Sequence, residues 1–182
     1  MLGNYQNSTN LHELFMAIEI ERKFLVKNTT FLAGKTGTPF KQGYLNREGA
    51  TVRVRVAGEK AFLTIKGKTQ GISRREFEYP IPVADAEQML TLCSLPAIEK
   101  DRFLIDYAGK CWEVDVFHGA NQGLIVAEIE LDSEDESIQF PDWIGVEVSH
   151  DARYFNSQLA SHPFSHWTLE TDHEKTNTDS PR

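Results

Sequence analysis

An alternation of charged and apolar residues recurs along this chain and constrains its fold more than any other feature. It begins in Ile18–Val26, IEIERKFLV, where Glu19, Glu21 and Lys23 occupy every second position. Side chains two residues apart on a β-strand share a face. Two carboxylates and an ammonium group therefore point one way, and the apolar residues point the other. The segment predicts a strand with one charged face and one apolar face.

The same alternation, with both signs of charge, predicts eight or nine strands. Short strands at about 10-residue spacing with few helices are typical of an antiparallel barrel or sandwich. Helical patterns are expected at residues 83–92, 133–137 and 152–161. The strands are expected near residues 17–26, 40–47, 50–57, 60–67, 72–81, 97–107, 110–118, 123–132 and 144–149.

The charged faces can point into water or into the centre of a closed sheet. For a single strand, charges in water are the usual arrangement. Like charges on one strand face repel each other, however, as Arg53 with Arg55 and Glu128 with Glu130 would do, so their repetition favours a functional surface. A closed barrel must place one of its faces inside, and a charged interior needs water and ligands because dry burial of charge is costly. We therefore expect a closed sheet with a charged lumen.

The residue types in that lumen indicate a ligand. Carboxylate pairs on facing strands supply the oxygen ligands that Mg²⁺ and Mn²⁺ prefer. Arginine and lysine bind phosphoryl oxygens, arginine by two parallel hydrogen bonds. The chain has no G-x-x-x-x-G-K-[ST] loop that would cradle phosphate at a helix start. The pattern predicts a site for a linear polyphosphate with divalent metal ions.

Composition excludes several other classes of partner. The formal net charge of −8 argues against a general nucleic-acid or anionic-membrane binder, which needs a basic surface. No apolar run approaches the roughly 20 residues of a membrane span, and the first residues lack the pattern of a signal peptide. Cys93 and Cys111 lie in dissimilar contexts without C-x-x-C spacing, so we expect a reduced, cytoplasmic chain.

The length of 182 residues suits one domain with small appendages. Residues 1–15 contain several turn formers and little periodicity, and we expect a leader or extension without function. Residues 16–168 are expected to form the barrel. Residues 169–182 are almost wholly polar and are expected to be a disordered tail.

Several segments resemble, in the right order, the CYTH or triphosphate tunnel metalloenzyme superfamily. E19-I-E-R-K23 is similar to the E-x-E-x-K signature of that superfamily, and the likeness extends over about residues 16–160. The other segments resemble its short bacterial tripolyphosphatase branch: K41-Q-G-Y-L45, V52-R-V-R55, T64-I-K66, S73-R-R-E-F-E78, I98-E-K-D-R-F103, E113-V-D-V-F117, V126-A-E-I-E130, G145-V-E-V and R153-Y-F-N156.

The resemblance implies a mainly β (α+β) fold, a closed eight-stranded antiparallel β-barrel tunnel with a few flanking helices. It implies hydrolysis of inorganic tripolyphosphate to pyrophosphate and phosphate, dependent on Mg²⁺ or Mn²⁺. Tyr44 and Lys100 match a catalytic pair. The implied metal ligands are Glu19, Glu21, Glu128 and Glu130, with Asp115 and Glu147 as weaker candidates. The implied polyphosphate ligands are Lys23, Arg53, Arg55, Lys66, Arg74, Lys100 and Arg102.

The sequence is also compatible with other functions. The same superfamily contains class IV adenylate cyclases and thiamine triphosphatases, and a polyphosphate-binding module without catalysis would need the same charges. A homodimer is also left open. Glu76 and Glu78 are interpreted as carboxylates that balance the basic residues across the lumen. Arg153 and Tyr154 either plug the tunnel or pack the last helix, whereas Trp112, Trp143 and Trp167 are expected to be packing residues.

Overall fold

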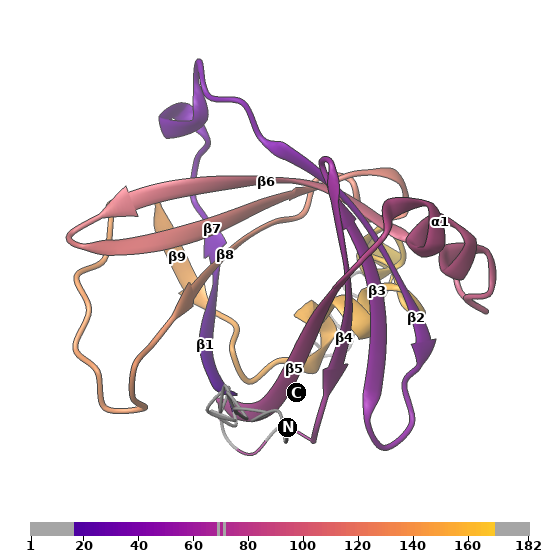
Figure 1. Cartoon of the computed structure of the whole chain (residues 1–182). Helices are drawn as coiled ribbons and strands as arrows, with labels where there is room; N and C mark the ends of the chain where they lie inside the picture. The colour runs from indigo at the N-terminus through magenta and orange to yellow at the C-terminus, as the bar shows by residue number, and fades with distance from the viewer. Residues whose placement is uncertain (1–16, 69, 71, 170–182) are drawn as a thin grey trace, which may run out of the picture.

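The computed structural model describes residues 17–68, 70 and 72–169, and strands form most of it (Figure 1). The predicted leader, residues 1–15, lies outside the described residues, as does the predicted tail from residue 170 onward. The strands are β1 (Ala17–Val26), β2 (Thr38–Asn46), β3 (Thr51–Ala57), β4 (Lys60–Lys66), β5 (Ser73–Ile81), β6 (Ile98–Tyr107), β7 (Lys110–Phe117), β8 (Ile125–Glu130) and β9 (Ile144–Glu147). The helices are α1 (Val83–Thr91) and α2 (Asn156–Leu159), with 3₁₀ turns η1 (Thr30–Leu32), η2 (Gly119–Asn121), η3 (Ala152–Tyr154) and η4 (Phe164–Leu169).

Eight of the strands close into an antiparallel barrel, which confirms the predicted fold. Their order is β5-β4-β3-β2-β6-β7-β8-β1, and β1 returns to pair with β5. The first half of β1 makes this closure, because Ala17–Ile20 pair with Ser73–Glu76. Beyond it, Phe24 pairs with Glu147 of β9, so β9 is a ninth strand outside the ring. A closed sheet has an inside and an outside, and alternation sends each strand's charged residues to one of them.

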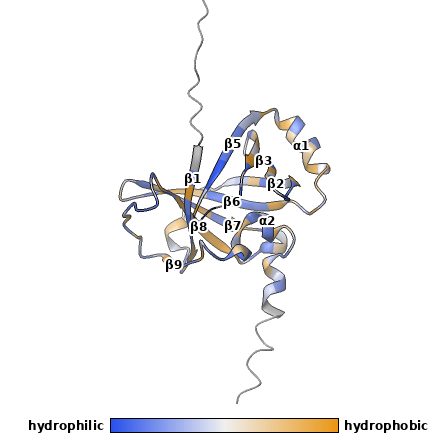
Figure 2. Ribbon diagram, turned by 90° about the horizontal axis from the view of Figure 1, so that it is seen from below, coloured by the Kyte–Doolittle hydropathy of each residue, from blue (hydrophilic) through white to orange (hydrophobic). Residues whose placement is uncertain are grey.

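The apolar face lies outside and is covered by other parts of the chain. On β1, β7 and β8, a buried cluster contains Phe24, Trp112 and Ile129, with Trp143 from the segment before β9 packed against it. Trp112 is completely buried, and its ring lies 5.7 Å from that of Trp143. Helix α1 covers β3 and β4 in the same way. Figure 2 shows hydrophilic and hydrophobic residues mixed along the strands, as this two-faced arrangement requires.

Two predicted helices differ from the structure. Residues 133–137 form turns, because Glu136 pairs with Lys110 and its side chain accepts a hydrogen bond from the Asp132 backbone at 2.6 Å. Residues 152–161 contain the 3₁₀ turn η3 and the four-residue α2, separated by Phe155 in an extended conformation. The helix predicted at residues 83–92 is present as α1. Among the described residues, no helix is long and apolar enough to cross a bilayer.

Candidate active site

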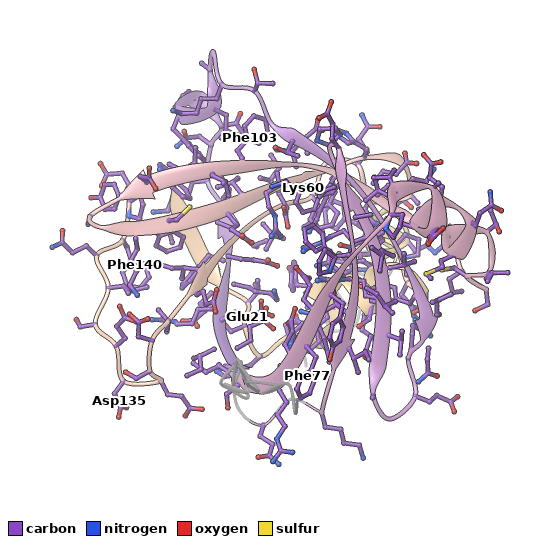
Figure 3. The ribbon with its side chains drawn as sticks, in the orientation of Figure 1. Glu21, Lys60, Phe77, Phe103, Asp135 and Phe140 are labelled. Carbon is purple, nitrogen blue, oxygen red and sulfur yellow. The ribbon has the colours of Figure 1, made fainter. Side chains whose placement is uncertain are left out.

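The charged strand faces meet inside the barrel and line a cavity of about 340 Å³. Figure 3 shows Glu21 pointing from β1 toward the interior of the ring. Six cations and seven carboxylates surround the cavity, so the lining carries one more negative than positive group. They are Lys23, Arg53, Arg55, Lys66, Arg74 and Arg102, with Glu19, Glu21, Glu76, Glu78, Glu113, Glu128 and Glu130. The interior is therefore ionic, as the alternation predicted.

A second cavity, of about 240 Å³, adjoins the first and shares part of its lining. It adds Tyr44, Arg47 and Lys68, together with the chain around α2. In the part of the chain that the structure describes, its cations number six, but Glu21 is its single acidic lining residue. The interior is thus divided into a mixed region and a strongly basic region.

Cross-strand register holds the cations of β3, β4 and β5 against carboxylates. Glu19 lies opposite Arg74, and the two side chains pair at 2.6 Å. Lys66 lies opposite Glu76 and pairs with it at 2.5 Å. The remaining contacts of this group are Lys66 with Glu19, Arg74 with Glu21, Arg53 with Glu76 and Glu78, and Arg55 with Glu78. Glu76 and Glu78 therefore balance basic residues across the lumen, as predicted.

A second set of ion pairs joins β1, β8 and β6. Lys23 pairs with Glu128 at 2.5 Å, and Arg102 reaches the other Glu128 oxygen at 3.0 Å. Burial opposes the charge on Lys23, but Glu128 and Glu21 outweigh it and hold the Lys23 pKa above its ordinary value. Burial likewise opposes ionisation of Glu128, yet Lys23, Arg102 and Lys100 hold its pKa well below the usual range. Both groups are therefore charged at neutral pH.

Glu130 differs from the other carboxylates of the cavity. It lies directly opposite Glu21 on the neighbouring strand, and its side chain makes no hydrogen bond or ion pair with the residues that the structure describes. Partial burial and the charges of Glu19 and Glu21 raise its pKa, although Lys110 opposes the shift. A carboxylate that has no cation partner and is repelled by two others can complete a donor set suited to a divalent ion.

The five predicted metal ligands do not form one cluster. Within the described residues, no three acidic, histidine or cysteine side chains already converge as a metal site. Glu19, Glu21 and Glu130 share the cavity and influence one another, so these three fit a divalent ion best. Glu128 also lines the cavity and, like Glu19 and Glu21, is engaged by two cations. Glu19 and Glu21, however, are the carboxylates of the lining whose charges act on Glu130. Asp115 is fully buried and lines neither of the two cavities.

Lys100 and Asp115 form a buried ion pair behind the cavity wall. Lys100 and Arg102 both bind Asp115, and the Lys100 and Asp115 side chains are almost wholly shielded from solvent. Burial lowers the Lys100 pKa to about 8, against the opposing effect of Asp115. Arg102 also pairs with Glu113 and lines the cavity. The Lys100–Asp115 pair thus stands behind Arg102, which reaches the lumen.

Tyr44 lines the basic cavity, but no hydrogen bond between Tyr44 and Lys100 occurs in the described part of the chain. The Tyr44 hydroxyl accepts a hydrogen bond from the Gln42 side chain at 3.0 Å. Burial raises the Tyr44 pKa to about 12, despite the nearby Arg53, Arg74 and Lys23. The hydroxyl is therefore protonated at neutral pH and suited to donate a hydrogen bond.

Glu147, the other weak metal candidate, lines neither cavity. It pairs with Arg22 at 2.6 Å and accepts a hydrogen bond from Ser149. Its cross-strand partner is Phe24, which belongs to the outer apolar cluster, so Glu147 is held away from the lumen lining. The alternation of β9 alone could not reveal this, because the face depends on how β9 pairs with β1.

Asn156 is a cavity residue to which the sequence assigned no role. It lines both cavities, whereas Arg153 and Tyr154, the candidates for a plug, line neither. Arg153 pairs with Asp151, and the Tyr154 ring packs against Trp167 with centroids 5.0 Å apart. The sequence signal that could have identified Asn156 was the segment R153-Y-F-N156, which carries part of the family resemblance and ends at this residue.

Comparisons with known proteins agree with this geometry. The model of the CYTH domain family matches residues 17–162. An inorganic triphosphatase of Acetivibrio thermocellus is 46% identical over 154 residues, covering 84% of this chain and 99% of that protein. An inorganic triphosphatase of Nitrosomonas europaea is 39% identical over 150 residues, covering 78% and 96%. A solved crystal structure of an inorganic triphosphatase is similar with a TM-score of 0.58 and 36% identity, covering 78% of this chain and 97% of that one.

Proposed function

Because this chain belongs to the CYTH domain family, we propose that it hydrolyses inorganic tripolyphosphate to pyrophosphate and phosphate with the help of a divalent metal ion. The observation that carries the proposal is the convergence of six cations and seven carboxylates on one cavity inside the barrel. The two inorganic triphosphatases that are 46% and 39% identical support it. Both are covered almost completely by this chain, so the likeness extends over their whole length.

The charge of the cavity explains why a metal ion is needed. A lining with one more carboxylate than cation does not by itself attract a polyanion. A divalent ion held by Glu19, Glu21 and Glu130 would remove their mutual repulsion and reverse that balance. When bound, it supplies positive charge against the phosphoryl oxygens. We assign this place to Mg²⁺ or Mn²⁺.

The cations of the lumen bind the substrate by exchanging partners. Arg53, Arg55 and Arg74 hold carboxylates in the free protein, and phosphoryl oxygens present the same acceptor geometry. Lys23, Lys66 and Arg102 extend this set around the cavity. The protonated Tyr44 hydroxyl donates a further hydrogen bond from the basic region. Each exchange leaves a carboxylate free, which favours entry of the substrate together with metal ions.

Lys100 contributes to the reaction through Arg102 in this arrangement. Its ion pair with Asp115 fixes the carboxylate that also binds the Arg102 guanidinium. For Lys100 to act directly with Tyr44, as the resemblance implies, the pair with Asp115 would have to open. We therefore assign Lys100 as a positioning residue and Tyr44 as a substrate ligand.

The lining favours inorganic triphosphate over substrates that carry a ring. An adenylate cyclase or a thiamine triphosphatase has to hold a base or a thiazole, for which aromatic stacking surfaces are suited. Among the described residues that line the two cavities, Tyr44 and Phe155 are the only aromatic ones, and charged side chains predominate. The scarcity of aromatic side chains favours tripolyphosphate over the organic triphosphates as the substrate.

A substrate panel tests the proposed function. Tripolyphosphate, ATP and thiamine triphosphate are offered to the full chain with Mg²⁺ and with Mn²⁺, and phosphate release and cyclic AMP are both measured. We expect tripolyphosphate to be cleaved at least about tenfold more efficiently than the organic triphosphates, because the lining binds phosphoryl groups and little else. Tight tripolyphosphate binding without turnover would identify a binding module, and cyclic AMP from ATP would identify a cyclase. Either result would contradict the proposal.

A further inference from the structure

The Asn156 side chain lies where the two cavities meet, and its amide oxygen lacks a hydrogen-bond donor among the described residues. Asn156 is one of six residues that line both cavities. Its side-chain Oδ1 is buried and has no hydrogen-bond partner within the described part of the chain. A buried acceptor without a donor is costly, so such atoms in native proteins have a ligand or a water as partner. The atom therefore indicates a donor that enters the tunnel.

The position of Asn156 coincides with the boundary between two electrostatic regions. The larger cavity contains seven carboxylates, including Glu130, and six cations, whereas the smaller contains six cations and one carboxylate. Tripolyphosphate oxygens are attracted to the basic side, and water is retained beside the carboxylates. An acceptor at this boundary can contact water on the carboxylate side while the substrate lies on the basic side.

The chain around Asn156 is held in place from two sides. Arg47, in the turn between β2 and β3, donates hydrogen bonds to the Ser157 carbonyl at 2.7 Å and to the Ser161 hydroxyl at 2.9 Å. Leu159 is almost fully buried in a cluster with Phe117 and Val126. The Asn156 side chain is therefore presented by a fixed segment, and a fixed acceptor can orient a reactant with little loss of entropy.

The groups present in the tunnel determine which of them can donate a hydrogen bond to Asn156 Oδ1. The four cations that line both cavities with Asn156 are already paired with carboxylates: Lys23, Arg53, Lys66 and Arg74. The phosphoryl oxygens of the substrate are acceptors. Water is the component that must both offer its protons to an acceptor and direct its oxygen at phosphorus. We propose that Asn156 Oδ1 accepts a hydrogen bond from the attacking water and aims its oxygen at the terminal phosphorus of tripolyphosphate. This inference rests on the proposed function.

The step balances without another reactant. The water oxygen forms a bond to the terminal phosphorus, and the bond from that phosphorus to the bridging oxygen breaks. The pyrophosphate leaves with the bonding electron pair. One water proton stays on the phosphate that is formed, and the other is taken up by the pyrophosphate. Asn156 orients the water throughout and is unchanged at the end.

The test separates kcat from KM in three variants. We expect Asn156→Ala to lower kcat for tripolyphosphate by about 10-fold to 100-fold, with KM changed less than about twofold, because an orienting contact to water is lost and substrate binding is not. Asn156→Asp keeps an acceptor oxygen in the same place and is expected to recover most of kcat. Gln88→Ala, which removes an exposed amide from α1 on the outer surface, is the control and is expected to behave as wild type.

Several results would overturn the inference. An unchanged kcat in Asn156→Ala would remove the role, and a raised KM with unchanged kcat would make the amide a substrate ligand. A melting temperature that falls in both variants in parallel with activity would make Asn156 structural. If Asn156→Ala does not fold, Asn156→Asp still decides, because a kcat as low as that of buffer excludes an acceptor role. Wild-type protein that leaves tripolyphosphate intact would instead contradict the proposed function.

Discussion

Glu130→Gln is expected to abolish metal-dependent hydrolysis and, at the same time, to make the metal-free protein slightly more stable. The carboxylate lies beside Glu19 and Glu21 without a described cation partner, and partial burial together with these charges raises its pKa. Removing the charge relieves repulsion in the free protein. It also removes a ligand from the donor set, and a loss of at least about 100-fold in turnover is expected.

Two measurements on the same samples check this prediction. Phosphate release is followed over a titration of Mg²⁺ and of Mn²⁺, and the melting temperature is recorded with and without each ion. The metal should raise the melting temperature of the wild-type protein. The metal-free Glu130→Gln variant should have a higher melting temperature than metal-free wild type, and the metal should raise it little further. Glu99→Gln is the control, because Glu99 is exposed on the outside and pairs with Lys41. Normal activity with an unchanged metal-induced shift in Glu130→Gln would remove Glu130 from the metal site.

Asp115→Ala is expected to destabilise the protein by about 3–5 kcal/mol, because it leaves the buried Lys100 amine without its carboxylate partner. The Lys100 side chain is 1% exposed and the Asp115 side chain is not exposed at all. Loss of Asp115 also removes one of three carboxylate partners of Arg102, whose guanidinium binds both Asp115 oxygens. Activity should fall with stability, since Arg102 lines the cavity.

Urea denaturation of the metal-free protein distinguishes the two roles considered for Asp115. A structural partner of Lys100 makes the single variant unstable without any metal present. A double variant, Lys100→Met with Asp115→Leu, replaces the pair by apolar side chains and should recover most of the lost stability. If Asp115 were instead a metal ligand, the metal-free stability of Asp115→Ala would equal that of wild type, and only metal binding would weaken.

The fold was predictable because one signal was repeated on nearly every strand. Charges at alternate positions in β1, β3 and β8 predicted which residues share a face, and closure of the sheet then placed that face inside. Like charges on one strand face, such as Glu128 with Glu130, favoured the interior over water. The helix predicted at residues 133–137 failed because local hydrogen bonds of Asp132 and Glu136 stabilise turns there.

The depth of a residue along the barrel was not predictable in this way. Alternation places Lys100, Arg102 and Asp115 on the inner face correctly, but it does not say that Lys100 and Asp115 lie behind the cavity wall while Arg102 lies on it. That distinction depends on the register of β6 with β2 and β7. Asn156 lies in a four-residue helix, which is too short for any periodic signal.

The central claim, that this ionic bore cleaves an inorganic triphosphate with a divalent metal, is tested most directly by ³¹P nuclear magnetic resonance of one reaction. Full-length protein is mixed with tripolyphosphate and Mg²⁺, and the phosphorus signals are followed before and after a metal chelator is added. The account predicts that phosphate and pyrophosphate appear in equal amounts and that the chelator stops their formation. Tripolyphosphate signals that persist with Mg²⁺ and with Mn²⁺, or hydrolysis that continues after chelation, would contradict it.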